Sequence, residues 1–71
     1  MKKADVKVNG EYSLKINGVF VRVRITGGPR PDPVYLNGRQ VFDWVRVNPP
    51  ENARKLNGYA SPAALHPLAG G

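Results

Sequence analysis

The chain has 71 residues with 11 Lys and Arg against 5 Asp and Glu, a formal net charge of +6, and no cysteine. This length holds one domain with a small core, and the lack of cysteine excludes disulfides and thiolate metal sites. Apolar runs are only a few residues long, so we expect neither a membrane span nor a signal peptide, and a cytoplasmic location. The charge favours a polyanionic partner, either nucleic acid or an acidic protein surface, although excess charge also serves solubility alone.

Four Asn-Gly pairs punctuate the chain, at residues 9–10, 17–18, 37–38 and 57–58. Both residue types tolerate a positive φ, which the type I′ turn of a β-hairpin requires at its two central positions. An Asn-Gly pair between alternating apolar residues is therefore typical of a tight hairpin. The sequence predicts a succession of antiparallel hairpins.

The turn at residues 17–18 sets the register of the first predicted hairpin, over about residues 11 to 26. One face pairs apolar side chains only: Tyr12 with Val23, Leu14 with Val21 and Ile16 with Val19. The other face pairs mostly polar side chains: Glu11 with Arg24, Ser13 with Arg22 and Lys15 with Phe20. Because side chains alternate along a strand, we expect the apolar face to lie on the core and the polar face toward solvent.

The middle of the chain begins with residues 27–33, where three prolines and two glycines predict a loop. Residues 34–36 and 39–47 are predicted strands, with a bulge or a longer turn as the alternative to strict pairing. In the second of these strands the valines at 41, 45 and 47 are expected to point inward, with Asp43 as an exception. The residues of the opposite face are then Phe42, Trp44 and Arg46.

The C-terminal part is expected to form a short pair, residues 53–56 with 59–60, around the last Asn-Gly. Ser61 as N-cap and Pro62 at the first helical position predict a helical or 3-10 turn over residues 61–65. The domain is expected to span residues 1–68, followed by a flexible tail at 69–71.

Short strands, tight turns and one late helical turn predict an all-β fold. We expect a small SH3-like barrel of about five short antiparallel strands, because closure leaves few unpaired edges in so short a chain. An open antiparallel sheet is the alternative.

Residues 2–12, 21–25 and 61–68 resemble a group of short, mostly uncharacterised bacterial and phage-type proteins of SH3-like barrel character. Such chains open Lys-Lys-Ala-Asp-Val-Lys, as residues 2–7 do here, and end in Ser-x-x-x-Leu-Arg-Pro, where His66 replaces the arginine. Residues 29–58 match the group poorly. The resemblance implies the fold and carries no functional residues.

Chemical groups suited to catalysis are sparse. The chain has one His, no Cys and five acids scattered among predicted loops and strands, so no nucleophile with a base and no set of metal ligands is apparent. We therefore expect no catalytic residues, no metal, no cofactor and no small-molecule substrate.

The outer face of the first hairpin is the candidate binding site, formed by Lys15, Phe20, Arg22 and Arg24. An aromatic ring among cations on a β-surface binds single-stranded nucleic acid, since bases stack on the ring while cations contact phosphates. In the alternative, Phe20 packs beneath the long loop and the cations only solvate an outer face.

A second possible interface comprises Tyr35, Phe42, Trp44 and Arg46. If exposed, these residues suit a protein interface, where Trp and Arg carry much of the binding energy. If buried, the aromatic residues are the largest members of the core, which is the interpretation we favour for Trp44.

Together these features predict a non-enzymatic basic module that binds nucleic acid through the outer face of the first hairpin. The alternative is a small protein-binding adaptor or inhibitor of phage type, docking on a larger nucleic-acid-handling machine such as RNA polymerase or a nuclease.

Overall fold

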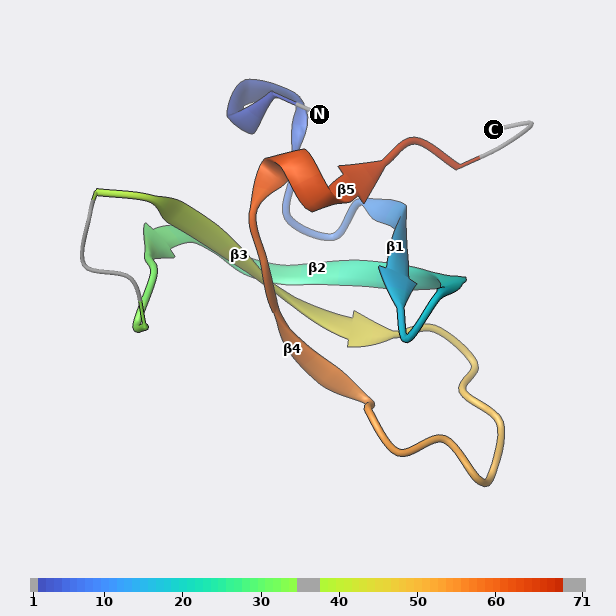
Figure 1. Ribbon diagram of the computed structural model, residues 1–71. Coiled ribbons are helices and arrows are strands. Elements are labelled where there is room, and N and C mark those ends of the chain that lie inside the picture. Colours follow the sequence, from blue (N-terminus) through green and yellow to red (C-terminus); the bar gives the residue numbers. More distant parts are fainter. Residues whose placement is uncertain (1, 35–37, 69–71) are drawn as a thin grey trace.

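The computed structural model describes residues 2–34 and 38–68. Its elements in chain order are η1 (Lys3–Asp5), β1 (Glu11–Ile16), β2 (Val19–Pro31), β3 (Gln40–Arg46), β4 (Asn57–Ala60), η2 (Pro62–Ala64) and β5 (Leu65–His66). The strands form one antiparallel sheet in the order β4-β3-β2-β1-β5 (Figure 1). The prediction of an all-β chain with five antiparallel strands and a late 3-10 turn is confirmed.

The sheet is open, as in the alternative to the predicted closed barrel. β4 and β5 are its two edges, and η2 carries the chain from one edge to the other (Figure 1). β5 has only two residues, which pair with Ser13 and Leu14, and within the described residues no ladder joins β4 to β1 or β5. These edge strands are short and do not pair with each other, so the sheet stays open between β1 and β4. We call this unpaired boundary the seam.

The first hairpin has the predicted register at all six pairs, from Glu11 opposite Arg24 to Ile16 opposite Val19. Asn17 and Gly18 have φ values of 50° and 82°, the two positive angles that a type I′ turn requires. The apolar face lies on the core as predicted except at the tip, where Val19 is 63% exposed. The outermost turn of the hairpin therefore projects beyond the core.

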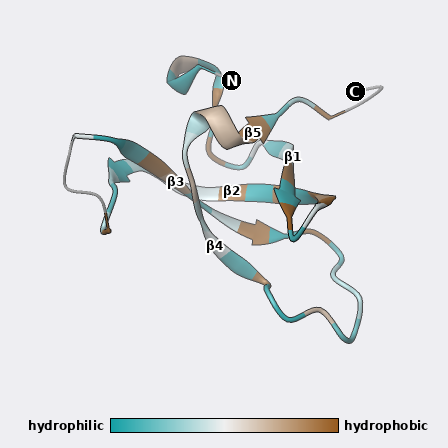
Figure 2. Ribbon diagram, viewed as in Figure 1, coloured by the Kyte–Doolittle hydropathy of each residue, from teal (hydrophilic) through white to brown (hydrophobic). Residues whose placement is uncertain are grey.

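The core lies on one face of the sheet and receives side chains from all five strands and from the N-terminal segment. Its buried members are Val6, Leu14, Val23, Ile25, Phe42, Trp44, Ala60 and Leu65. Hydrophilic and hydrophobic residues follow one another along the strands (Figure 2), and the opposite face is mostly polar, with Phe20 and Val45 as apolar exceptions. In Figure 1 the chain from β4 crosses in front of β3 and β2 before it enters η2 beside β5, and Ala64 of η2 packs against the core.

The expected orientation of β3 is wrong for Phe42, Trp44 and Val45, whereas Val41 is buried as expected, with 1% exposure. Phe42 and Trp44, expected to point away from the valines of that strand, are each only 2% exposed, whereas Val45 is 37% exposed. The pairing with β2 is the reason: Trp44 lies opposite Ile25, and paired residues share a face of the sheet. Ile25 is fully buried, so its neighbour lies in the core too.

The predicted loop at residues 27–33 is wrong for residues 27–31, which continue β2. Gly27 pairs with Asp43 and Arg30 with Val41, and two register shifts interrupt the ladder between Ile25 and Arg30. β-Bulges accommodate proline and glycine, because the extra residue needs no ladder hydrogen bond. The glycines and prolines that suggested a loop instead lie at bulges within a long strand.

The last Asn-Gly pair is not a turn. Residues 57–58 lie inside β4 and pair with β3, so the predicted pairing of residues 53–56 with 59–60 is wrong. A Cβ atom on Gly58 would lie 3.0 Å from Cζ2 of Trp44, so this glycine makes room for the indole. At residues 9–10 only Asn9 has a positive φ, and no hairpin turn forms there.

Several expectations concern residues outside the described part of the chain. These are the flexible tail at 69–71, the strand residues Tyr35 and Leu36, and Asn37 of the third Asn-Gly pair. Within the described residues, no helix has the length and apolar character needed to cross a bilayer.

Candidate functional site

Strands β1, β2 and β5 bring the candidate binding residues together on the polar face of the sheet. Lys15 lies opposite Phe20, and Ser13 lies opposite Arg22 on one side and His66 on the other. The four predicted residues Lys15, Phe20, Arg22 and Arg24 thus share one surface, which we call the outer face, and β5 adds His66 to it. Residues of a two-residue strand show no periodicity, so no sequence signal could have placed His66 there.

Phe20 is the aromatic centre of the outer face and is 57% exposed. The Nζ atom of Lys15 lies 5.8 Å from the centroid of its ring, and the His66 ring meets it edge-on at a centroid distance of 5.7 Å. The alternative in which Phe20 packs beneath a long loop is wrong, because residues 27–31 belong to β2 and leave the ring exposed. The outer face therefore presents an accessible aromatic ring beside a cation.

Glu11 holds the two arginines of the outer face. Its carboxylate accepts a hydrogen bond from Arg22 Nε at one oxygen and from Arg24 Nη2 at the other, the latter at 3.1 Å. The predicted pair of Glu11 with Arg24 is confirmed, and Arg22 joins it. The hydrogen bond from Arg24, followed by that from Arg22, holds the pKa of Glu11 below its usual value. With Lys15 included, three cations against one carboxylate leave this face a net charge of +2.

A second charged cluster lies toward the other edge of the sheet. Arg30 donates two hydrogen bonds to Asp43, with Nε to Oδ2 at 2.9 Å and Nη2 to Oδ1 at 2.7 Å. The Arg30 guanidinium also lies 5.4 Å from the centroid of the Tyr59 ring. The bonds from Arg30 lower the pKa of Asp43. This bidentate pair links the bulged end of β2 to β3, so the Arg30 guanidinium is already engaged in a contact within the fold.

Phe42 and Trp44 of the second predicted interface are buried, so the possibility that they form an exposed surface is wrong for these two residues. Phe42 and Trp44 belong to the core, as in the alternative that we favoured for Trp44. Arg46 is half-buried beside a groove on the core side of the sheet. Tyr35 lies outside the described residues.

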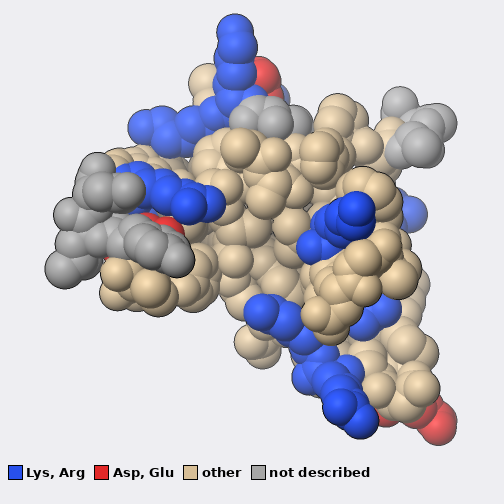
Figure 3. Space-filling view, in the orientation of Figure 1, with Lys and Arg blue, Asp and Glu red and all other residues tan. Residues whose placement is uncertain are grey.

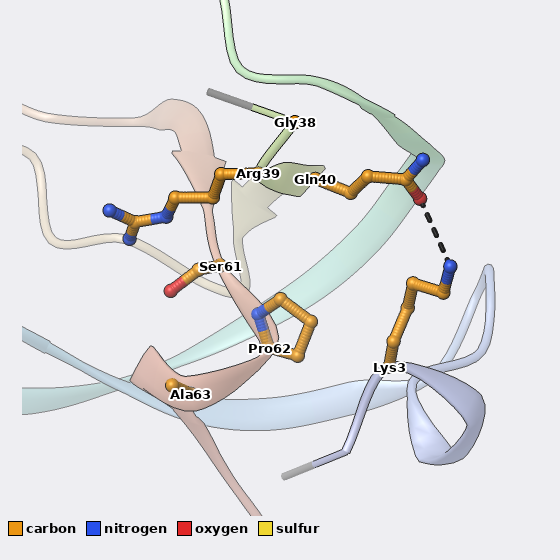
Figure 4. A pocket seen from close by; sticks show the side chains of 7 residues that line it. All are labelled: Lys3, Gly38, Arg39, Gln40, Ser61, Pro62 and Ala63. Carbon is orange, nitrogen blue, oxygen red and sulfur yellow. Dashed lines mark hydrogen bonds between the residues drawn. The ribbon is translucent and has the colours of Figure 1, made fainter. Parts of the chain in front are cut away.

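A shallow hollow lies beside η2 (Figure 4). Its lining residues are Lys3, Gly38, Arg39, Gln40, Ser61, Pro62 and Ala63. Lys3 Nζ donates a hydrogen bond to Gln40 Oε1 at 3.2 Å across its mouth. Among these residues no base lies beside the Ser61 hydroxyl and there is no carboxylate, so the hollow offers no catalytic pair. Elsewhere in the described chain, no three His, Asp or Glu residues gather as metal ligands.

Comparison with protein-family models, curated proteins and solved structures finds no significant match. The resemblance to short SH3-like proteins therefore stays a prediction, and the outer face is the feature from which a function can be inferred.

Proposed function

We propose that the protein is a non-enzymatic basic module that binds single-stranded nucleic acid through its outer face. The observation that carries the proposal is the exposed ring of Phe20, which has Lys15 at 5.8 Å and two arginines on the same strand. Aromatic rings on β-surfaces stack with bases of any sequence, and neighbouring cations neutralise phosphates. The expected binding is thus governed by backbone charge and stacking, with little sequence preference.

Glu11 sets the strength of this binding. In the free protein it occupies hydrogen-bond donors of Arg22 and Arg24, so a phosphate must compete with a carboxylate for the same guanidinium groups. Lys15 has no ion pair among the described residues and needs no such exchange. We expect modest affinity that falls steeply with salt, because bound phosphates release counterions.

We further propose that the sheet has SH3-like ancestry. Two observations support this: a long β2 that pairs with both β1 and β3, and a 3-10 turn that leads from β4 to a short last strand beside β1. This chain order agrees with the late turn that the sequence predicted. In this proposal the barrel stops short of closure at the seam between β1 and β4.

The experiment is an anisotropy titration of a labelled 12-residue oligo-dT with wild-type protein and two sets of variants. Phe20→Ala removes stacking and is expected to weaken binding by about 1–3 kcal/mol while leaving the salt dependence nearly unchanged. The double variant Arg22→Ala, Arg24→Ala is expected to flatten the salt dependence. The matched control, Lys2→Ala with Lys7→Ala, removes two exposed charges that are not part of the outer face and should leave the Phe20 contribution intact.

If neither variant set changes oligo-dT binding while circular dichroism shows a folded protein, the outer face is only a solvated exterior and the proposal fails. If binding vanishes near physiological salt while a stoichiometric protein complex survives, the adaptor function is favoured instead.

A further inference from the structure

A groove runs along the seam on the core side of the sheet, opposite to the outer face. It consists of two adjoining hollows that share Ile16, Asn17 and Lys55. On one side lies the tip of the first hairpin, and on the other lie residues 50–61, which include β4. We call it the seam groove, and its principal lining residues are Ile16, Val19, Val21, Trp44, Arg46 and Lys55.

The floor of the seam groove is aliphatic. Ile16 and Val21 pack partly buried against the core, and Val19 beside them is 63% exposed. A branched aliphatic side chain this open to water gains free energy when an apolar partner covers it. Aliphatic groups have no flat π-face, so the floor suits aliphatic side chains of a peptide better than stacked bases.

The rim of the seam groove is cationic, with Arg46, Arg54 and Lys55 among its lining residues. No Asp or Glu lies among the residues that line it, and none of the three cations has an ion pair within the described chain. In Figure 3, blue Lys and Arg side chains border a tan central area on the face shown, and little acid is visible. The arginines on the other side of the sheet differ, because Glu11 and Asp43 already hold them.

An edge strand borders the same groove. β4 pairs with β3 alone in the described chain, and Tyr59 and Ala60 of β4 line the groove. The outer edge of such a strand offers backbone N–H and C=O groups to an extended peptide. Trp44, which forms part of the wall, has a buried Nε1–H without an acceptor in the described residues, a costly state for a buried donor.

We infer that the seam groove binds an extended acidic peptide segment of a partner protein. Its aliphatic side chains cover Ile16, Val19 and Val21, its carboxylates meet the cationic rim, and its backbone lies along the edge of β4. Lys15 at the tip of the hairpin lines the margin of the groove, whereas Phe20, Arg22 and Arg24 of the outer face do not. The protein would thus join a nucleic acid on one side of its sheet to a protein on the other.

The test uses the intrinsic fluorescence of Trp44, which is the single tryptophan of the chain and lies in the wall of the groove. The probe is a 12-residue peptide of three Asp-Leu-Glu-Val repeats, which has no aromatic residue. The matched probe, three Asn-Leu-Gln-Val repeats, keeps the aliphatic pattern and removes the charge. We expect a saturable one-to-one change in Trp44 emission with the acidic peptide, and at least tenfold weaker binding of the amide peptide.

Variants locate the binding. Arg54→Glu with Lys55→Glu is expected to weaken the acidic peptide at least tenfold, whereas Lys2→Glu with Lys7→Glu makes the same change in net charge away from the groove and should have little effect. Val19→Ser is expected to weaken binding severalfold. Val34→Ser is its matched control, since both valines are 63% exposed and only Val19 lines the groove.

Three results would overturn the inference: no saturable response to the acidic peptide, equal binding of both peptides, or equal loss in variants and controls. Displacement of the peptide by oligo-dT with a matching change in Trp44 emission would instead make the groove a nucleic-acid surface. Phe20 is not part of the groove. Phe20→Ala should therefore leave oligo-dT binding at the groove unchanged, whereas it should weaken oligo-dT binding at the outer face.

Discussion

Removing the carboxylate of Glu11 should strengthen nucleic-acid binding rather than weaken it. Glu11→Gln keeps the size of the side chain but releases Arg22 and Arg24 from the carboxylate that now holds both. A substitution that improves binding is more informative than one that impairs it, because general damage to the fold does not produce a gain.

The magnitude follows from the charge count on the outer face. For single strands the log–log dependence of affinity on salt is about −0.7 per phosphate neutralised, so a net charge of +2 gives a slope of about −1.4 and +3 in the variant gives about −2.1. The ratio of variant to wild-type affinity should therefore rise about fivefold when salt is lowered tenfold.

The assay is a series of oligo-dT titrations at five salt concentrations with wild-type protein, Glu11→Gln and the control Glu51→Gln. Glu51 is exposed, lies in the connection between β3 and β4, and has no ion pair among the described residues. Both variants raise the net charge by one, so only an effect confined to Glu11 supports binding at the outer face. Equal slopes for the two variants would refute the reasoning.

Three further predictions concern stability. Leu14→Ala should lower the free energy of unfolding by roughly 2–4 kcal/mol, because Leu14 is buried between Val21 and Leu65, and a thermal melt like that of wild type would contradict the core assignment. Gly58→Val should cost about 1–3 kcal/mol in urea unfolding, since a Cβ atom there approaches the Trp44 indole to 3.0 Å, and an unchanged midpoint would mean that the ring yields. Bonds from Arg30 lower the pKa of Asp43, so this pair stabilises the fold above the ordinary carboxyl pKa, and the contribution is lost as pH falls through the lowered one. Asp43→Asn should accordingly be less stable than wild type at neutral pH and lose less stability on acidification, and parallel pH profiles would count against it.

The first hairpin could be predicted from the sequence in full, because everything that specifies it is local. Asn17 and Gly18 supply the two positive φ values, and strict alternation on both sides leaves one register that keeps the apolar residues together. The same local pattern is sufficient to assign Lys15, Phe20, Arg22 and Arg24 to one face of the hairpin. The sequence also predicted the ion pair of Glu11 with Arg24, which lies directly opposite on the neighbouring strand, but not the ion pair of Glu11 with Arg22.

Only the tertiary structure decided the orientation of β3, the role of residues 27–31 and the environment of the last Asn-Gly pair. Each depends on a residue distant in sequence: Trp44 lies opposite the buried Ile25, and the Trp44 indole leaves little room for a Cβ atom at position 58. Two bulges in β2 shift the register, and composition alone cannot distinguish a bulged strand from a loop.

What the sequence determined by itself is thus a charged hairpin with an aromatic ring on its polar side. The return of β5 beside β1, which adds His66 to that side, and the seam groove beneath the hairpin arise from the packing of strands far apart in the chain. Periodicity specifies which side chains of a strand share a face, but the partner strand decides which face is buried, and that choice is made by the whole core at once.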